Sequence, residues 1–260
     1  MEKVTSKDGT PIAFRRSGEG KPLLLVHGTT ADHHRWAAIS PQLEPHFTVY
    51  AMDRRGRGDS GDAPEYNINR EAEDVAAIVE AIDDPVFVLG HSYGALCSLE
   101  AALLTNNISR LILYEPPVPT DAPLISRDVP ERMETLIDKG ELEDALVLFM
   151  REGPKMPEHE LKTYRQLPMW PRRVQHAPTI PREIAIDWTY TFNGEKFADV
   201  QVPTMLLLGS DSPPPFHKGI ALIDAALPTS QIVIMPGQQH IAMNIDPDLF
   251  VEEVLQFLQD

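Results

Sequence analysis

Ser92 lies in the segment Gly90-His91-Ser92-Tyr93-Gly94, and its place between two glycines is typical of a catalytic nucleophile. A short apolar run, residues 86–89, precedes the segment, and a helix-like run, residues 95–104, follows it. A G-x-S-x-G sequence at such a junction forms a tight, strained turn in which side chains at the glycine positions would collide with neighbouring backbone. The pattern therefore predicts a serine hydroxyl raised above the edge of a sheet, near the positive end of a helix, and covalent catalysis by that serine.

A serine hydroxyl is a weak nucleophile near neutral pH and needs a base within hydrogen-bond reach. His240 follows the predicted strand 231–235 and precedes a helix, so we expect it to be that base. His217, in a proline-rich turn, is the alternative that the pattern favours less. With a histidine base, activity is expected to rise between about pH 6 and 8 as the imidazole becomes neutral.

The base in turn needs a carboxylate that orients its ring and stabilises the imidazolium. We expect Asp211 to fill this role. It follows the predicted strand 204–209, and His240 follows the next predicted strand, 231–235. Glu115 is the alternative, since it ends the strand after the nucleophile segment. The two prolines that follow Glu115 directly favour a structural role for it instead.

Backbone N–H groups near the nucleophile are expected to hold the oxyanion that forms during acyl transfer. His27-Gly28-Thr29-Thr30 follows a buried apolar run, and its glycine permits close approach of the backbone. We expect the N–H of Thr29 and the N–H of Tyr93, just after the nucleophile, to form this pair.

The elements that must position these residues are buried strands alternating with helices. Asp8-Gly9 predicts a hairpin between residues 2–6 and 11–16. Continuous apolar runs predict strands buried on both faces at 23–26, 48–52, 86–89, 109–114, 204–209 and 231–235. Helical runs at 69–82, 93–104, 218–227 and 247–258 lie between or after them, which indicates parallel crossover units. Each candidate functional residue follows a strand, where open α/β sheets bind ligands.

The strand pattern is interrupted by residues 118–199, which we expect to form a helical cap inserted into a core of residues 1–117 and 200–260. Candidate helices within the insertion are 129–139, 141–152, 157–167 and 181–191. Its apolar side chains are expected mainly to pack the insertion. Met150, Trp170 and Trp188 are our candidates for lining an apolar substrate pocket.

These motifs together resemble the α/β-hydrolase fold family. The resemblance rests on the order Ser92, Asp211, His240, on the His27-Gly28 loop and on residues 53–60, which are similar to the family's Asp-x-x-Gly-x-Gly-x-Ser segment. It implies an α/β fold with a mostly parallel eight-stranded sheet, flanking helices and a helical cap. It also implies a serine hydrolase without a cofactor that cleaves carboxylic esters, thioesters or lactones of small to medium, largely apolar substrates.

Serine at position 92 disfavours the family members that use aspartate to open epoxides or displace halide. Three alternatives remain: hydrolysis of carbon–carbon bonds, perhydrolysis without a cofactor, and a ligand-binding protein that has lost catalysis. The glycines and arginines of residues 53–60 could suggest phosphate binding, but the segment lacks the Gly-Lys-Ser/Thr ending of a P-loop, so a structural turn is expected.

Two further clusters are expected to be structural. Asp32-His33-His34 and His27 match no zinc spacing, and adjacent side chains there should point apart, so no metal is expected. Cys97 lies on the helix after the nucleophile and is expected to pack in the core.

The composition excludes several classes of partner. The chain carries 39 acidic and 23 basic residues, for a formal net charge of −16. Such a charge disfavours nucleic acids and anionic membranes, so we expect a small-molecule substrate. The single cysteine, the polar N-terminal residues and the lack of a long apolar run predict a cytoplasmic protein. The oligomeric state is left open by the sequence.

Overall fold

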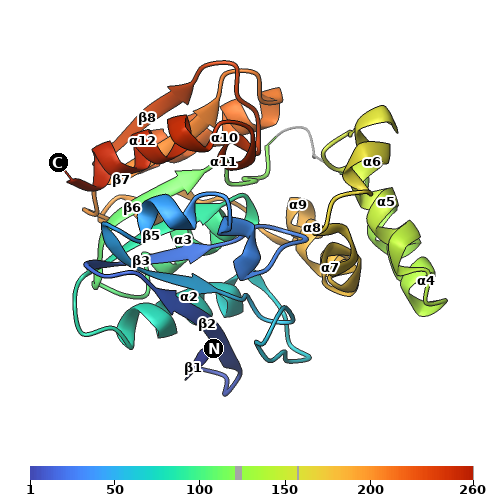
Figure 1. Cartoon of the computed structure of the whole chain (residues 1–260), viewed down its shortest axis with the longest axis horizontal. Coiled ribbons are helices and arrows are strands. Elements are labelled where there is room, and N and C mark those ends of the chain that lie inside the picture. Colours follow the sequence, from blue (N-terminus) through green and yellow to red (C-terminus); the bar gives the residue numbers. More distant parts are fainter. Residues whose placement is uncertain (121–124, 157, 260) are drawn as a thin grey trace. The chain divides into compact units, whose positions relative to one another are not determined.

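The computed structural model describes residues 1–120, 125–156 and 158–259 (Figure 1). Residues 121–124 and 157 of the predicted insertion, and residue 260 of the predicted core, lie outside the described residues. The chain forms two compact units. The sheet unit comprises Met1–Gly28, Asp32–Val118 and Phe192–Asp260, and the helical unit comprises Thr29–Ala31 and Pro119–Thr191.

The sheet unit contains one eight-stranded, mostly parallel sheet, as the resemblance implied. Its strands are β1 (Glu2–Thr5), β2 (Pro11–Ser17), β3 (Lys21–Val26), β4 (Phe47–Met52), β5 (Val86–His91), β6 (Ile108–Tyr114), β7 (Thr204–Gly209) and β8 (Ser230–Met235). Their order across the sheet is β1-β2-β4-β3-β5-β6-β7-β8. The pairs β1–β2 and β2–β4 are antiparallel, and all other neighbours are parallel. The predicted hairpin is confirmed, with Gly9 at a φ of 90° in its turn.

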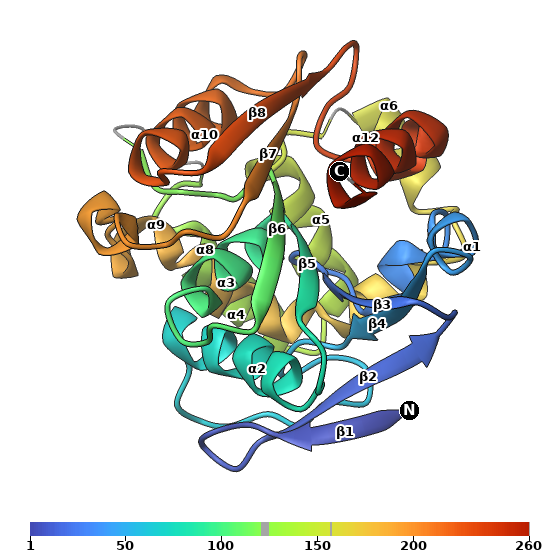
Figure 2. The ribbon, with the colours of Figure 1, turned by 90° about the vertical axis from the view of Figure 1, so that its left-hand side faces the viewer.

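Helices cover both faces of this sheet (Figure 2). They are η1 (His33–Trp36), α1 (Ser40–Leu43), α2 (Ile68–Glu80), α3 (Tyr93–Ala101), η3 (Gly194–Phe197), α10 (Pro214–Ala226), α11 (Ala242–Ile245) and α12 (Pro247–Gln259). Figure 2 shows α1 and α12 on one side and α2, α3 and α10 on the other. One apolar core joins Trp36, Leu43, Phe250 and Val254 to the side chains of the sheet face beneath them.

The helical unit is built from short helices around a core of its own. They are α4 (Val129–Asp138), α5 (Leu142–Glu152), α6 (Glu158–Tyr164), α7 (Trp170–Gln175), η2 (Ala177–Thr179), α8 (Ile180–Ile184) and α9 (Ile186–Thr189). The predicted helix 181–191 is interrupted at Ala185, and α7 was not predicted. Pro171 favours a break in a helix when only the sequence is considered. In the structure it lies in the first turn of α7, where a backbone N–H has no acceptor within the helix, so its missing N–H costs no hydrogen bond.

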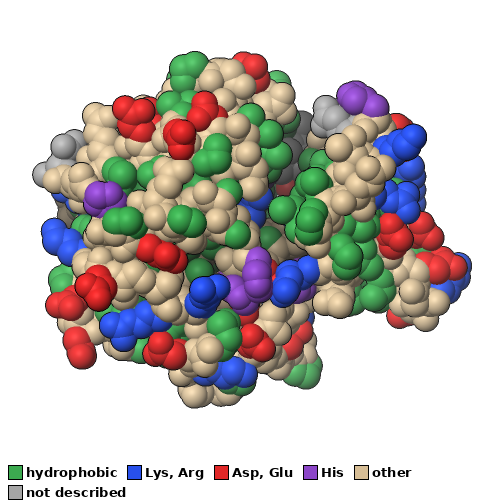
Figure 3. Space-filling view, viewed as in Figure 1, with side chains coloured by type: hydrophobic (Ala, Val, Ile, Leu, Met, Phe, Trp, Pro, Cys, Tyr) green, Lys and Arg blue, Asp and Glu red, His purple; other side chains and the backbone are tan. Residues whose placement is uncertain are grey.

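Acidic and basic side chains are scattered among apolar ones on the face shown in Figure 3. Within the part of the chain that the structure describes, no helix combines the length and the apolar character needed to cross a membrane.

Candidate active site

Ser92 lies at the sharp turn between β5 and α3 and has a strained backbone. Its φ is 54° and its ψ is −126°, a combination that non-glycine residues rarely adopt. The flanking glycines are required because a Cβ on Gly94 would lie 2.4 Å from the carbonyl oxygen of His27, and a Cβ on Gly90 would lie 2.5 Å from Cα of Ala95. The local structure is therefore the nucleophile turn that the G-x-S-x-G sequence predicts.

Glu115, at the end of β6, provides the carboxylate that contacts His240. Its Oε2 lies 2.6 Å from Nδ1 of His240, and the Glu115 side chain is fully buried. The other oxygen, Oε1, accepts hydrogen bonds from the Gly209 N–H at 2.8 Å and from the Ser212 hydroxyl at 2.5 Å. A buried carboxylate with three such donors has hydrogen-bond partners that compensate for its burial.

This contact corrects the expectation for Asp211. Asp211 is exposed, and its Oδ1 accepts a hydrogen bond from the Ser210 hydroxyl at 2.8 Å rather than from the imidazole. The residues around Asp211 instead support Glu115, since Gly209 at the end of β7 and Ser212 in the turn after it donate to Glu115. The two prolines after Glu115 did not prevent this geometry, because Glu115 adopts a φ of 46° that turns the chain at the strand end.

The His240 imidazole packs against two neighbouring rings. Phe216 of α10 stacks on it with ring centroids 4.6 Å apart and an interplanar angle of 23°. The His91 ring lies 4.7 Å away on a tilted plane. Sequence reasoning missed Phe216, although its position next to the rejected candidate His217 placed it after β7. Because Nδ1 donates to Glu115, Nε2 of a neutral His240 is the ring's acceptor.

Among the described residues, neither the Ser92 hydroxyl nor Nε2 of His240 has a hydrogen-bond partner. The structure thus brings His240 against Glu115 and against His91, the residue that precedes Ser92. Hydrogen bonds between catalytic groups are often made only when substrate is bound.

The predicted oxyanion loop begins close to the nucleophile. A Cβ on Gly28 would lie 2.8 Å from Cβ of Ser92, so only glycine allows this approach. His27 is completely buried; its Nε2 accepts from the Arg54 N–H at 3.1 Å, which makes Nδ1 the donor to the Gly28 carbonyl at 2.8 Å. Burial, together with Arg54 and Arg57, holds the pKa of His27 well below 6.5. Thr29 itself belongs to the helical unit, so its N–H remains a predicted donor.

Arg54, in the segment of residues 53–60, packs against Tyr93. The Arg54 guanidinium lies 4.6 Å from the Tyr93 ring centroid and pairs with Glu71 at 2.6 Å, both charges being fully buried. Tyr66 donates to Glu71 at 2.9 Å, and its hydroxyl lies 3.0 Å from that of Tyr93. This network fixes the side chain of Tyr93, the residue that follows Ser92.

Comparison with known proteins places this geometry in a family. The model of the family described as "Alpha/beta hydrolase family" matches residues 23–253. The chain belongs to the alpha/beta hydrolase family. An alpha/beta hydrolase from Sphaerobacter thermophilus DSM 20745 superposes with a TM-score of 0.88 at 37% identity, with 99% of this chain and 100% of that chain covered.

Two further proteins similar to this chain carry more specific names. RutD of Agrobacterium fabrum, which is named as a carbamate hydrolase, is 28% identical over 253 residues. The match covers 94% of this chain and 95% of that protein. The esterase RhEst1 from Rhodococcus sp. ECU1013 is 26% identical with a TM-score of 0.79, covering 100% of this chain and 98% of the other. Membership supports hydrolase chemistry.

One group of potential metal ligands occurs among the described residues of this alpha/beta hydrolase. Ligand atoms of Asp32, His33 and His34 lie within 4.8 Å of one another, and the two imidazole centroids are 3.9 Å apart. The expectation that these side chains point apart is therefore wrong. Their Nδ1 atoms are already engaged, His33 with Asp53 at 2.7 Å and His34 with Asp32 at 3.2 Å. These hydrogen bonds explain the cluster as an anchor of the short helix η1.

The three proposed pocket residues have different surroundings within the helical unit. Met150 and Trp170 are buried in its core, and Trp170 donates from Nε1 to Glu143 at 3.0 Å. Packing thus accounts for both of them. Trp188 is half-buried, with the Arg127 guanidinium 5.9 Å from its ring centroid.

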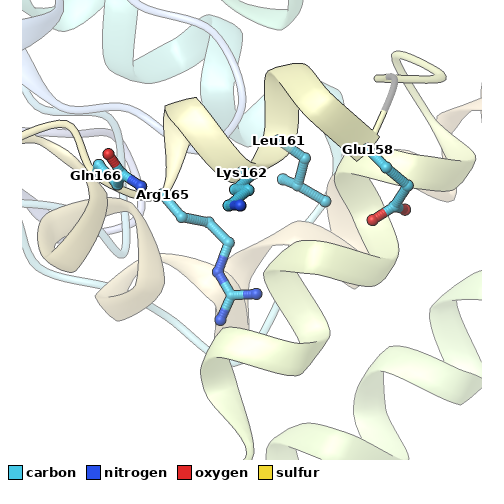
Figure 4. Close-up of a pocket in the computed structure, with 5 residues that line it drawn as sticks. All are labelled: Glu158, Leu161, Lys162, Arg165 and Gln166. Carbon is cyan, nitrogen blue, oxygen red and sulfur yellow. The ribbon is translucent and has the colours of Figure 1, made fainter.

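A surface depression of about 500 Å³ lies along α6 of the helical unit, lined by Glu158, Leu161, Lys162, Arg165 and Gln166 (Figure 4). Two of its charged side chains are already paired, Arg165 with Glu143 at 2.7 Å and Glu158 with Arg151 at 2.5 Å. These residues offer a solvated polar surface rather than a nucleophile with an adjacent base.

Proposed function

We propose that this protein is a serine hydrolase in which Ser92, His240 and Glu115 form the catalytic triad. The single observation that carries the proposal is the buried Glu115 carboxylate 2.6 Å from Nδ1 of His240, at the same sheet edge as the strained Ser92. A fully buried acid of this kind orients the imidazole and stabilises its protonated form during the reaction.

In the proposed mechanism, Nε2 of His240 accepts the proton of the Ser92 hydroxyl as Oγ attacks a carbonyl carbon. The N–H groups of Tyr93 and Thr29 hold the oxyanion. His240 then gives the proton to the leaving group, which departs and leaves an acyl-serine. Water, deprotonated by His240, attacks that acyl group and releases a carboxylic acid.

Carboxylic esters are the proposed substrates, with thioesters and lactones reacting by the same route. The esterase RhEst1, which aligns over nearly the whole chain, supports the choice of esters. The helical unit is proposed as the cap that sets substrate size, with Trp188 as a lining residue. The proposed substrates are largely uncharged.

The test uses p-nitrophenyl esters of increasing acyl length, assayed with the wild-type protein and with Ser92→Ala. We expect turnover of short to medium esters and a loss of roughly four decades of kcat in Ser92→Ala, with unchanged circular dichroism. A fluorophosphonate probe should add one phosphonyl group, mapped to Ser92 by peptide mass spectrometry. Ester turnover that survives in Ser92→Ala would overturn the proposal.

Hydrolysis of a carbonyl–nitrogen bond is the second candidate, and the similarity to RutD favours it. The same acyl-serine would form, but His240 would protonate a nitrogen leaving group. Matched esters, amides and carbamates with one acyl group decide between the two. A kcat/KM for the amide or carbamate above that for the ester would move the assignment to this second class.

A further inference from the structure

His91 and Tyr114 come from adjacent strands and both reach the loop that carries His240. They are directly paired in the parallel register of β5 and β6, which lie side by side in Figure 2. Their rings are 5.2 Å apart and both side chains are buried. Each stands one residue before a member of the proposed triad, His91 before Ser92 and Tyr114 before Glu115.

The two side chains hydrogen-bond to consecutive carbonyl groups of that loop. Nε2–H of His91 donates to the His240 carbonyl at 2.8 Å, and the Tyr114 hydroxyl donates to the Gln239 carbonyl. The Tyr114 hydroxyl also accepts from the Ala242 N–H at 3.0 Å. Two side chains therefore hold the backbone of residues 239–242 at three points.

These bonds matter because no strand or long helix holds this part of the chain. Residues 239–241 lie between β8 and the short helix α11, where the backbone would otherwise bond to water. The imidazole of His240 can turn only about bonds that start from this backbone. An error of about 1 Å in its placement can reduce the rate of the reaction about a hundredfold.

The hydroxyl of Tyr114 is suited to act as a permanent donor. Burial, together with the charge of Glu115, raises its pKa far above the usual value for tyrosine. It therefore keeps the proton that it donates to the Gln239 carbonyl at and around neutral pH.

We propose that His91 and Tyr114 are positioning residues that fix the backbone of His240, and so couple the nucleophile strand and the acid strand to the base. This inference rests on the proposed function only for the role of His240. The positional effect itself is measurable without turnover.

The first experiment records the low-field proton resonance of the His240 Nδ1–H that is hydrogen-bonded to Glu115. Glu115→Gln identifies the resonance by abolishing it. We expect Tyr114→Phe and His91→Phe, which keep a ring but remove the donor, to shift or broaden this resonance. His91→Gln, which restores a donor, should return it toward the wild-type position. Tyr50→Phe is the matched control, because it removes a hydroxyl from β4 that has no hydrogen-bond partner among the described residues.

The second experiment measures the rate at which a fluorophosphonate labels Ser92 in the same variants. Tyr114→Phe and His91→Phe should label about tenfold more slowly than Tyr50→Phe, with His91→Gln intermediate and all variants folded by circular dichroism. With p-nitrophenyl esters, the loss should fall on kcat rather than KM.

The inference is overturned if Tyr114→Phe is folded, keeps the wild-type resonance and labels within about twofold of Tyr50→Phe, a difference too small for a lost positional contact. Should His91→Phe fail to fold, Tyr114→Phe and His91→Gln decide the question. Failure of wild-type Ser92 to react at all would instead count against the proposed function and would leave the resonance test in force.

Discussion

Oε2 of Glu115 and Nδ1 of His240 lie 2.6 Å apart, and the carboxylate is buried while the imidazole is 27% exposed. The acid is thus shielded from water and held from its other side by Gly209 and Ser212. The His240 side chain keeps part of its surface exposed to solvent. A hydrogen bond between an ion and its partner is strongest under such shielding.

The two carboxylates at neighbouring strand ends can be ranked by mutation. Glu115→Gln is expected to lower kcat about a thousandfold or more, since the amide favours the wrong imidazole tautomer. Asp211→Asn should change kcat by no more than about threefold, because the Asp211 side chain is exposed and contacts Ser210 instead. Steady-state kinetics on one ester checks both, and the reverse ranking would return the acid role to Asp211.

Gly94, two residues after Ser92, should tolerate no side chain. In Gly94→Ala the new Cβ meets the backbone oxygens of Val26 and His27, each at 2.4 Å, so backbone must move. We expect a destabilisation of about 1–3 kcal/mol or more, measured by urea unfolding, together with loss of Ser92 labelling. Gly219→Ala is the control, because its Cβ would meet only ordinary contacts at 3.5 Å and lies in a helix. That variant should be as stable as wild type or up to about 1 kcal/mol more stable.

The free energy of unfolding should decrease as the pH is lowered, because of His27. The folded protein keeps this imidazole neutral, with a pKa well below 6.5, whereas the unfolded chain binds a proton near pH 6.5. Below that pH the unfolded state holds more protons, so the free energy of unfolding decreases by about 1.4 kcal/mol per pH unit until the folded pKa is reached.

Replacing His27 by glutamine removes this titration while keeping a donor and an acceptor. The free energy of unfolding is measured for wild type and for His27→Gln at pH 7.5, 6.5 and 5.5. As the pH falls, the value for wild type should therefore decrease relative to the value for His27→Gln. A difference that stays constant across these three values would contradict a neutral buried imidazole.

The buried ion pair behind Tyr93 should be sensitive to loss of one charge. Glu71→Gln leaves the Arg54 guanidinium, which has no exposed surface, without its carboxylate. We expect a destabilisation of about 3–5 kcal/mol, which chemical unfolding would measure. Glu65→Gln removes an equivalent charge from the exposed pair with Arg70 and should change stability by less than about 1 kcal/mol. Equal effects of the two variants would show that burial does not set the strength of the Arg54–Glu71 pair.

The local pattern was sufficient to predict the nucleophile turn and most of the sheet. Residues 90–94 carry their own constraint, because two glycines and a serine between a strand and a helix admit few backbone conformations. The apolar runs that form β3, β4, β5 and β7 identify strands buried on both faces. A strand of this kind needs no partner to be recognised.

Only the tertiary structure decided which residues surround His240. Glu115 and Asp211 end adjacent parallel strands, which lie only about 5 Å apart, so chain order is compatible with either as the acid. The choice depends on a positive φ at Glu115 and on two donors to its carboxylate, the N–H of Gly209 at the end of β7 and the hydroxyl of Ser212 in the turn that follows. The tertiary structure alone likewise showed that His91, Tyr114 and Phe216 contact His240 or its loop. Their spacing in the chain carries no signal, because contacts between residues far apart in sequence arise from the packing of the sheet and its loops.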